Sequence, residues 1–442
     1  MGVAREVPGA WPLLGHALPL VRRPLSFVTA LARSGDVVRI RLGPLPVYAV
    51  TDPALVHRVL VSEAPNFKRG RFHERATRVF GQGLLATSGT VHVSRRRTVQ
   101  PAFHRARIDA YTKAMSDAAV RISESWHPGQ VVAVDHVMND LSLAMLASTL
   151  FPSEFGVRAA AELQHAVPLI TRAAVVRAVL PAAWAKLPTR GNRRLETALA
   201  GLDAAVAEAI AECRSTGRDQ GDLLSMLLAV QDAEGRGLTD REIQDQVMNF
   251  AVAGVETTGA TLAWVFHELG RNPEVEQRLH AEVDGALAGR APGHEDLTTL
   301  ELTGRVILEA LRLYAACYIT RRTQGPVELG GTRVPAGAEV LFSPYALHRD
   351  PRWFPDPERF DPDRWLPERA AQIPRGAYLP FGSGGHQCIG NTFALAEMTA
   401  ALAVICQRWR LRPLPGAEVR PVARATVHPS QLPMTAESRT GG

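Results

Sequence analysis

The pattern of apolar and polar residues divides the chain into a short strand-rich start and a long helical middle. Val37 to Ile40 and Val47 to Val50 are rich in β-branched residues and flank a turn-like Gly-Pro segment. This pattern is typical of a β-hairpin. From about residue 53 to residue 325 apolar residues recur mainly at helical spacing. Short strand-like segments then return at 327–329 and 339–342.

The most strongly patterned element is a long helix that we expect to begin at Thr239. Thr239 and Glu242 have the spacing of a capping box. The helical pattern continues to Gly270, ahead of Pro273. Such a helix, of about 31 residues, is about 47 Å long. Its middle, Val247 to Phe266, is apolar or small on nearly all sides, so we expect it to be buried.

These elements predict a mainly α fold with a smaller β portion. A last helix is expected from about Thr392 to Trp409. No linker or repeat divides the sequence, so we expect a single domain over 1–442. Its β-rich parts should lie at about 35–60 and 315–345. We expect the tail at 436–442 to be disordered.

Composition excludes several classes of protein. Hydrophobic residues make up 46% of the chain, enough for a large buried core. The net charge of +6 includes no polybasic block, and aromatic residues are only 6%, which argues against a nucleic-acid partner. No apolar run reaches the roughly 18 residues of a membrane span, and the N-terminus lacks a signal-peptide pattern. We therefore expect a cytoplasmic protein without a membrane span.

The cysteine pattern singles out Cys388. The chain has 4 cysteines, widely spaced and without a CxxC pair, which argues against a disulfide framework and a structural zinc site. Cys388 lies in the glycine-rich stretch Phe381-Gly-Ser-Gly-Gly-His-Gln-Cys-Ile-Gly390, just before the last expected helix. Backbone N–H groups and the helix dipole favour a thiolate there. Because a thiolate on haem iron promotes O–O cleavage, Cys388 is a candidate iron ligand. The alternative is a buried structural cysteine.

This stretch resembles the signature of the cytochrome P450 family, F-x-x-G-x-(R/H)-x-C-x-G. Phe381, Gly384, His386, Cys388 and Gly390 occupy its fixed positions. The resemblance implies a P450 fold with haem b between the long central helix and the cysteine loop. It also implies that Cys388 is the axial ligand of the iron and that His386 contacts a propionate. The implied activity is that of a monooxygenase, which inserts one atom of O2 into its substrate.

A second motif lies in the middle of the long helix. Ala253-Gly-Val-Glu256-Thr257-Thr258 places an acid beside hydroxyl groups in an otherwise apolar helix, which is costly unless the acid is paired or functional. A threonine hydroxyl can also bond to its own i−4 carbonyl and bend the helix. In the family this A-G-x-(D/E)-T motif relays protons for oxygen activation, which implies catalytic roles for Glu256 and Thr257. The alternative is an acid satisfied by a buried arginine.

A third group of charged residues resembles the structural Glu–Arg–Arg network of the family. Glu309 and Arg312 have the i,i+3 spacing of a helical ion pair. Arg359, in the loop 354–360, resembles the third member of that network. The implied role is structural.

A fourth group resembles the residues of the family that bind the haem propionates. His92 and Arg96 stand four residues apart, and the planar guanidinium of arginine suits a carboxylate. Arg321 is a further candidate for a propionate contact, and its neighbour Arg322 is the alternative.

The residues that should face the substrate by family position are mostly apolar, which favours a small lipophilic substrate. They are Phe80, Leu84, Leu85, Asn249, Phe250, Ala253, Tyr318, Ile319 and Leu432. The run of the chain is similar to bacterial family members that oxidise terpenes in antibiotic pathways. The resemblance therefore implies a terpenoid or another secondary-metabolite intermediate as substrate.

The sequence departs from the family after Arg312. Where many members have two prolines, this chain has Ala315 and Ala316. Alanine favours helix whereas proline ends it. We therefore expect either a longer helix or a more mobile segment before Tyr318.

The resemblance also implies partners. No flavin or iron–sulfur segment is present, so electrons should come from NAD(P)H through separate proteins, a ferredoxin or flavodoxin and its reductase. A candidate basic docking face consists of Arg95, Arg97, Arg105 and Arg107. Two other functions stay open: oxidative coupling or peroxide-driven oxidation by the same haem, and a non-catalytic haem sensor.

Overall fold

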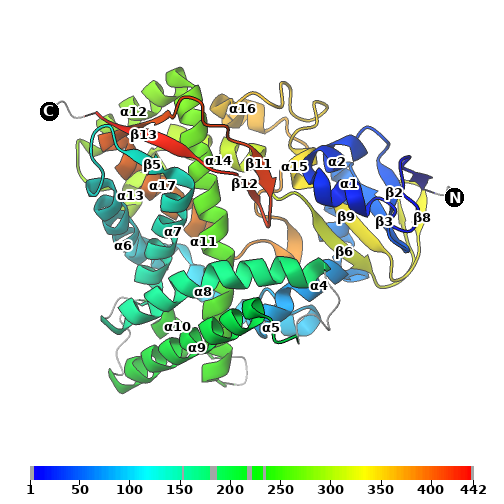
Figure 1. The fold of residues 1–442 in the computed structure, drawn as a ribbon, viewed down its shortest axis with the longest axis horizontal. Helices are drawn as coiled ribbons and strands as arrows, with labels where there is room; N and C mark the ends of the chain where they lie inside the picture. The colour runs from blue at the N-terminus through cyan, green and yellow to red at the C-terminus, as the bar shows by residue number, and fades with distance from the viewer. Residues whose placement is uncertain (1–3, 152–153, 180–186, 217–221, 232–234, 440–442) are drawn as a thin grey trace. The chain divides into compact units, whose positions relative to one another are not determined.

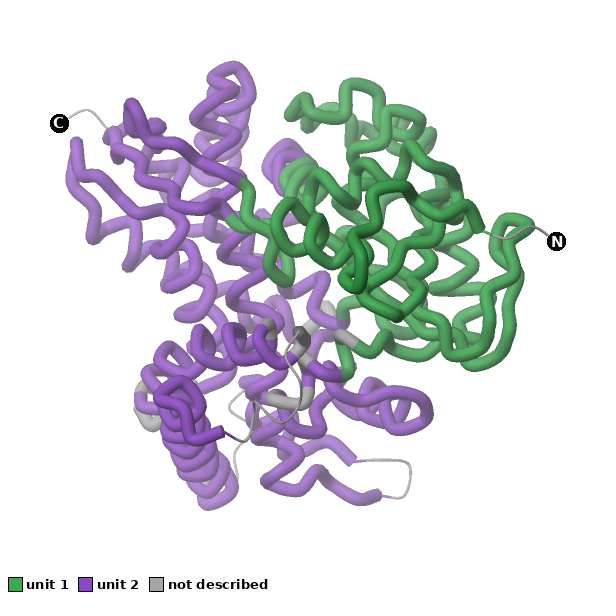
Figure 2. Tube along the Cα trace, turned by 45° about the vertical axis from the view of Figure 1, so that its right-hand side comes forward, with its two compact units in different colours: residues 1–74, 308–388, 421–428 green, residues 75–307, 389–420, 429–442 purple. Residues whose placement is uncertain are grey.

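The computed structural model describes residues 4–151, 154–179, 187–216, 222–231 and 235–439. The chain forms two compact units, coloured separately in Figure 2. Unit 1 consists of residues 1–74, 308–388 and 421–428, and unit 2 of residues 75–307, 389–420 and 429–442. Because the segments of the units alternate along the chain, no single cut in the sequence separates them. The single domain expected from the sequence stays a prediction.

Unit 1 is built around a mixed sheet that has six strands in the described part of the chain, in the order β1-β2-β3-β9-β6-β4. These strands are β1 (Arg5–Glu6), β2 (Val37–Leu42), β3 (Leu45–Val50), β9 (Glu339–Phe342), β6 (Ile319–Thr323) and β4 (Phe67–Arg69). Smaller ladders pair β7 (Val327–Leu329) with β8 (Thr332–Val334) and β11 (Pro421–Ala423) with β12 (Val427–Pro429). The helices are α1 (Ala17–Arg22), α2 (Pro24–Leu31), α3 (Pro53–His57), α15 (Pro344–Leu347) and α16 (Pro367–Ala370). Two further helices, α4 (Arg71–Ala76) and α14 (Glu301–Leu313), have residues in both units.

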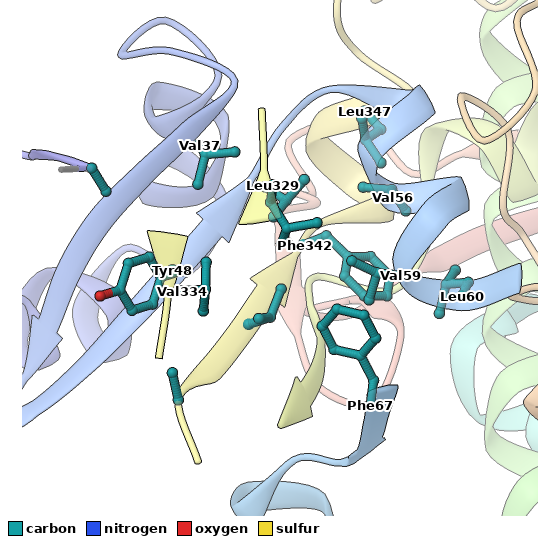
Figure 3. Packing of buried hydrophobic residues seen from close by; sticks show 14 of the residues in the cluster. Val37, Tyr48, Val56, Val59, Leu60, Phe67, Leu329, Val334, Phe342 and Leu347 are labelled. Carbon is teal, nitrogen blue, oxygen red and sulfur yellow. The ribbon is translucent and has the colours of Figure 1, made fainter. Parts of the chain in front are cut away.

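The hairpin expected near the start of the chain is confirmed as β2–β3. Its antiparallel register runs from Val37 opposite Val50 to Leu42 opposite Leu45. Gly43 makes the turn with a φ of +61°, a left-handed conformation that favours glycine. Strand side chains join those of the helical segment 53–62 in one apolar cluster, as Figure 3 shows. The labelled members are Val37, Tyr48, Val56, Val59, Leu60, Phe67, Leu329, Val334, Phe342 and Leu347.

Unit 2 is mainly helical, which confirms the predicted fold class. Its helices are α5 (Gly89–Val99), α6 (Arg105–Glu124), α7 (Val134–Leu150), α8 (Glu154–Val179), α9 (Arg190–Thr216), α10 (Leu223–Ala229), α11 (Asp240–Arg271), α12 (Pro273–Leu287), α13 (His294–Thr299) and α17 (Asn391–Arg408). A small antiparallel sheet orders β10 (Trp409–Pro413), β13 (Pro433–Ser438) and β5 (Val131–Ala133). Among the described helices, none has the length and apolar character needed to cross a membrane.

The long helix predicted from the sequence is α11, drawn in green in Figure 1. The predicted capping box is present: the backbone N–H of Thr239 donates to the Glu242 carboxylate at 3.0 Å, and the Glu242 N–H donates to the Thr239 hydroxyl at 3.3 Å. α11 packs closely against α7 at Gly259, where an added Cβ would lie 2.4 Å from the Asn139 side chain and 2.7 Å from its Cα. Glycine therefore sets the spacing between these two helices.

α7, α11 and α17 enclose an acid that the sequence analysis did not single out. Glu397 on α17 is 1% exposed and accepts a hydrogen bond from the Ser142 hydroxyl of α7 at 2.8 Å. Burial raises the pKa of Glu397 to about 8, against the opposing effect of hydrogen bonds from Ser142 and Thr258. Desolvation of the carboxylate outweighs those hydrogen bonds, so Glu397 is mostly protonated at neutral pH.

This buried acid gives a prediction for the pH dependence of stability. Between the ordinary glutamate pKa and about 8, the folded state binds a proton that the unfolded state has released. The free energy of unfolding should therefore fall as the pH rises through this range, by up to about 1.4 kcal/mol per pH unit. Glu397→Gln cannot ionise, so thermal unfolding measured at pH 5.5 and pH 8.5 should show a smaller loss of stability than in the wild type. An equal loss in both proteins would contradict the assignment.

The end of α14 corrects one expectation. α14 ends at Leu313, so the prediction that Ala315 and Ala316 extend the helix is wrong. The last carbonyls of the helix and the segment after it bind groups from another part of unit 1. The Arg349 guanidinium donates to the Leu313 carbonyl, and the Tyr345 N–H donates to the Ala316 carbonyl at 3.0 Å. Tertiary hydrogen bonds therefore override the helical preference of alanine.

Two expected boundaries were also wrong. Residues 436–438 lie in β13, paired with β10, and are not disordered. The rest of the predicted tail, beyond residue 439, lies outside the described residues. The β-rich part at about 35–60 ends at Val50, because residues 53–62 are helical. The β-rich part at about 315–345 is confirmed as β6 to β9.

Candidate functional site

Cys388 is the last residue of a tight loop, residues 381–388, which ends the 308–388 segment of unit 1. Its backbone N–H donates to the carbonyl of Phe381 at 2.9 Å, and the N–H of Gln387 donates to that of Gly384 at 3.0 Å. Gly384 has a φ of +70°, and a Cβ there would lie 1.9 Å from the carbonyl oxygen of Leu60. Only glycine fits at that position. The loop is thus fixed by backbone contacts, and Cys388 is exposed.

The segment before the loop is anchored by a neutral histidine. His348 accepts the N–H of Leu379 at Nε2, at 2.8 Å, and its Nδ1 lies 3.1 Å from the carbonyl oxygen of Arg312. Burial lowers the pKa of His348 to about 3. The imidazole is therefore neutral, with its proton on Nδ1, as both hydrogen bonds require. Tyr378 adds a hydrogen bond from its hydroxyl to the Leu308 carbonyl at 2.9 Å. These contacts fix the cysteine loop relative to α14.

The other three cysteines are in different surroundings. Cys317 and Cys406 are buried, and Cys213 is half-buried with its sulfur 3.3 Å from the Ser225 hydroxyl. Burial raises the pKa of the Cys317 thiol to about 12 and that of Cys406 further still. Such thiols stay protonated and do not act as metal ligands. Of the 4 cysteines in the chain, all of which the structure describes, Cys388 is the exposed one.

Two arginines, Arg69 buried and Arg321 half-buried, lie opposite each other on neighbouring strands of unit 1. Arg69 on β4 is the direct register partner of Arg321 on β6. Burial and the charge of Arg321 lower the pKa of Arg69 to about 9, and burial lowers that of Arg321 to about 10. Like charges directly opposite each other on adjacent strands are destabilising. The arrangement is therefore suited to an anion that contacts both guanidinium groups.

The structure favours Arg321 over Arg322 as the anion contact. Arg322 already forms an ion pair with Glu74, at 2.6 Å and 2.7 Å to the two carboxylate oxygens. The Arg321 guanidinium donates to the neighbouring carbonyl of Thr320 at 3.0 Å. Arg322 is thus already neutralised by a carboxylate.

Glu309 is the centre of a buried network in unit 1. It pairs with Arg312 at 2.8 Å, and both side chains are 0% exposed. Its carboxylate also accepts hydrogen bonds from Arg364, Trp365 and the backbone of Asp361. The predicted Glu309–Arg312 pair is confirmed.

The third arginine of this network differs from the expectation. Arg364 lies 3.4 Å from the Glu309 carboxylate and is buried. The side chain of Arg359 is exposed, and this residue takes part through its carbonyl, which accepts from Arg312 at 3.2 Å. The assignment of Arg359 was therefore wrong. The short helical turn Pro362–Trp365 turns Arg364 inward, a feature that the loop sequence does not reveal.

In unit 2 the expected His92 and Arg96 lie one turn apart on α5. His92 is 3% exposed, whereas Arg96 is half-buried. Their spacing places both side chains on one face of the helix, as predicted. Whether they contact a propionate stays a prediction.

The acid–hydroxyl motif occupies an accessible stretch of a helix that is otherwise buried. Ala253 is exposed, and Gly254, Glu256 and Thr257 are half-buried, while the neighbouring turns are buried. The Thr257 hydroxyl donates to the carbonyls of Ala253 at 2.7 Å and Gly254 at 3.3 Å. The predicted back-bond to the i−4 carbonyl is confirmed. The side of α11 that carries the motif is thus open to a ligand.

The nine residues proposed for the substrate pocket fall into two groups. Four have accessible side chains: Leu85, Ala253, Tyr318 and Ile319. The others are buried: Phe80, Leu84, Asn249, Phe250 and Leu432. Phe250 packs edge-to-face on Phe103 with ring centroids 5.1 Å apart. The side-chain amide of Asn249 forms hydrogen bonds with backbone groups. These two residues are packing elements in this structure.

Sequence reasoning missed Arg69 and Arg364. Arg69 lies in a three-residue strand, and its role follows from the register with Arg321, which joins segments about 250 residues apart. Its one local signal is the basic pair Lys68-Arg69 directly after Phe67. Arg364 and Arg359 are equally plausible in the sequence, because both follow proline-rich turns.

These features fit the haem that the sequence predicts. A haem-thiolate site needs a cysteine ligand, partners for the anionic propionates and close approach of the backbone. Unit 1 offers an exposed thiol in a glycine-closed loop and, on β4 and β6, the facing pair Arg69 and Arg321. α17 begins at Asn391, shortly after Cys388, and its N-terminal N–H groups favour a thiolate. The donor set is therefore that of a haem-thiolate protein.

Comparisons with known proteins agree with this chemistry. A family model described as Cytochrome P450 matches residues 6–435. The chain is 45% identical to cyclooctatin synthase of Streptomyces melanosporofaciens, over 98% of this chain and 95% of the relative. It is 46% identical to cyclooctat-9-en-7-ol 5-monooxygenase of the same organism, with the same shares of both chains. It is 40% identical to pentalenene oxygenase of Streptomyces avermitilis, over 100% of this chain and 98% of the relative.

A solved structure supports the fold. The haem domain of cytochrome P450DA matches with a TM-score of 0.87 at 27% identity, over 99% of both chains.

Proposed function

The chain belongs to the cytochrome P450 family of haem monooxygenases, and from this premise we propose that its substrate is a terpenoid or a similar lipophilic intermediate of secondary metabolism. The proposed haem-thiolate chemistry rests on the exposed thiol of Cys388, which lies in a loop that only glycine can close. Haem, when bound, supplies the iron on which O2 is activated. The residues of this chain bind the haem, orient the substrate and deliver protons.

Cys388 would hold the haem iron through its thiolate. The backbone of Phe381, Gly384 and Gly390 lets the haem approach closely. Arg69 and Arg321 would hold a propionate, and its negative charge would relieve the repulsion between these two cations.

His92, Arg96 and His386 are the remaining proposed propionate contacts. They combine a planar guanidinium with imidazole donors, which suits carboxylate groups at different angles.

Glu256 and Thr257 are the proposed proton carriers. The Thr257 hydroxyl donates to a carbonyl one turn earlier, so its oxygen lone pairs are free to accept a proton-bearing partner from the accessible side of α11. Glu256 is half-buried beside it, so its carboxyl group is accessible for proton exchange. Proton delivery by a positioned side chain typically accelerates a reaction by about 10²–10⁴-fold.

The substrate class is supported by the relatives and by the accessible apolar positions. Three relatives with at least 40% identity carry names that refer to cyclooctatin or pentalenene oxidation. Leu85, Ala253 and Ile319 present small or apolar surfaces, which suit a hydrocarbon skeleton. Tyr318, 44% exposed, supplies a polar group that can orient a hydroxylated intermediate.

We propose that electrons come from NAD(P)H through a ferredoxin or flavodoxin and its reductase, and that the reaction takes place in the cytoplasm. The basic docking face expected near α5 is smaller than the sequence suggested. Arg95 is 16% exposed in its side chain and pairs with Glu242 at 3.4 Å. Of the other candidates, Arg97 is exposed and Arg107 is half-buried, while the side chain of Arg105 lies outside the described residues.

The test of the proposed cofactor is the optical difference spectrum of the reduced protein with and without carbon monoxide. A strongly red-shifted Soret band in the wild type, absent in Cys388→Ser, is the expected result because a thiolate ligand produces that shift. Cys213→Ser is the matched control, because the Cys213 thiol forms a hydrogen bond with the Ser225 hydroxyl. This variant should keep the red-shifted band. Loss of haem binding in well-folded wild-type protein would overturn the proposal.

The substrate class is tested separately. Pentalenene and cyclooctat-9-en-7-ol should displace the water ligand of the ferric iron and shift its spin state, whereas a charged fatty acid of similar size should not. Labelled dioxygen then separates the reaction types: insertion places one labelled atom in the product, while oxidative coupling places none. A haem sensor would show no substrate-dependent consumption of NADPH.

A further inference from the structure

An irregular loop of unit 2, residues 81–87, is held by side chains of α11. The loop has no regular backbone pairing of its own, so its N–H groups need other partners. Three of them donate to side chains of α11, two of which are adjacent in the chain and the third of which lies one turn further on. The pairs are Gln82 to Asp245 at 2.7 Å, Leu84 to Gln246 at 3.2 Å and Leu85 to Asn249 at 2.8 Å.

Asn249 is the central member of this set. Its Oδ1 accepts from the Leu85 N–H, while its Nδ2 donates to the Phe80 carbonyl at 2.7 Å and to the Asp245 carbonyl at 2.6 Å. The side chain is 1% exposed. One amide group therefore binds the residue before the loop, a residue within the loop and its own helix. Both N–H donors and the carbonyl oxygen of the Asn249 side chain form hydrogen bonds.

Two glycines let the loop lie against these side chains. Gly81 has a φ of +67°, and a Cβ there would lie 2.2 Å from the Asp245 carboxylate. A Cβ on Gly83 would lie 2.3 Å from the Asn249 amide nitrogen. Any larger residue at either position would push the loop away from α11. The glycines and the polar side chains thus form one complementary contact.

The contact lies on the same stripe of α11 as the accessible motif. Gln246, Asn249, Ala253 and Thr257 follow one another at helical spacing on one face. Along the axis, Ala253 is about 6 Å and Thr257 about 12 Å beyond Asn249. The side of α11 that carries the loop therefore continues directly into the side that is open to a ligand.

We propose that Asn249, together with Asp245 and Gln246, positions the loop 81–87 as a preformed wall of the substrate site, with Leu85 as its accessible apolar face. This inference rests on the proposed function, because it assumes that the ligand lies along the Ala253–Thr257 stripe. Asn249 is a positioning residue: it acts on the substrate through the loop and does not touch the substrate itself. If the loop is ordered before binding, a ligand does not have to offset the entropy cost of ordering it. A fixed wall also cannot adapt to ligands of different shape, so it discriminates between them.

The first test measures hydrogen exchange of the holoenzyme in peptides that cover residues 81–87. Asn249→Ala should raise the exchange rate of this loop about tenfold, because a bound N–H loses its partner. The matched control is Gln244→Ala, which removes an amide of α11 that binds the Asp203 carbonyl of α9 at 3.3 Å. This control should leave exchange in the loop unchanged.

A second variant perturbs the same contact from the loop. Gly83→Ala inserts a methyl group against Asn249 and should also raise exchange in the loop. Its control is Gly285→Ala on α12, where no atom lies within 4 Å of the added Cβ. The proposal can therefore be tested even when Asn249→Ala does not fold.

The second readout is ligand discrimination, which a merely structural contact would not change. Imidazole and 4-phenylimidazole both bind haem iron, and the phenyl group adds bulk on the ligand side. The ratio of their dissociation constants should change about tenfold in Asn249→Ala and Gly83→Ala, with the carbon monoxide band intact, because the wall is no longer preformed. The ratio should be unchanged in both controls.

Two outcomes would overturn the inference: unchanged exchange in the loop of both variants, or faster exchange with an unchanged ratio. A wild-type protein without haem would instead refute the proposed function. The exchange measurement would then decide by itself whether α11 fixes the loop.

Discussion

We expect Glu309→Gln to lower the free energy of unfolding by about 3–5 kcal/mol, the usual cost of breaking a buried ion pair from one side. Glu309 is fully buried and accepts hydrogen bonds from Arg312, Arg364, Trp365 and the backbone of Asp361. Glutamine removes the charge and replaces one accepting oxygen by a donor, so two buried guanidinium groups lose their counter-ion. Because folded proteins are stable by only about 5–15 kcal/mol, much of the protein should unfold well below the wild-type temperature.

Thermal unfolding of two arginine variants provides the control for this network. Arg364→Leu should destabilise the protein strongly, because it removes a buried partner of Glu309. Arg359→Ala should have little effect, within about 0.5 kcal/mol, because its side chain is exposed and its carbonyl, which binds Arg312, is kept. The opposite order of effects would show that Arg359 is the third member of the network after all.

Thr257→Ala should reduce product formation about 100-fold while NADPH and O2 are still consumed. The Thr257 hydroxyl lies on the accessible side of α11 and donates to the Ala253 carbonyl at 2.7 Å. Alanine keeps the helix but removes the hydroxyl that we propose as a proton carrier. Oxygen should then leave as hydrogen peroxide, which is measured together with NADPH consumption and product.

The matched control for this prediction is Thr261→Ala, one turn further along α11. Thr261 makes the same kind of back-bond, to the Thr257 carbonyl at 2.9 Å, but it is buried. Its substitution should leave the ratio of product to NADPH unchanged. Equal uncoupling in both variants would mean that helix geometry, rather than the hydroxyl of Thr257, controls the reaction.

Elements with strong local signals were predictable from the sequence. The capping box of Thr239 and Glu242 and the apolar run behind it define α11 almost to the residue. The β-branched segments around Gly43 define the β2–β3 hairpin. In both cases the determining interactions lie within a few residues of one another, so a single stretch of sequence contains them.

Predictions failed where distant segments compete for the same backbone groups. Alanine at positions 315 and 316 favours a longer helix, but Arg349 and Tyr345 bind the carbonyls at that point and end α14. The segment 436–438 has no strong local pattern, yet it gains order by pairing with β10. Helical propensity amounts to less than about 1 kcal/mol per residue, so a few tertiary hydrogen bonds suffice to override it.

The sequence by itself determined the chemistry of this protein: the candidate thiolate of Cys388, the acid–hydroxyl pair of Glu256 and Thr257, and the helix that carries the pair. These residues belong to short motifs whose spacing is set by the geometry of one loop or one helix. Only the tertiary structure decided that Arg69 faces Arg321, that Arg364 rather than Arg359 completes the Glu309 network, and that Asn249 binds a loop. Each of those contacts joins residues that are distant in the chain or that have an equally plausible neighbour, and strand register and helix packing alone select between them.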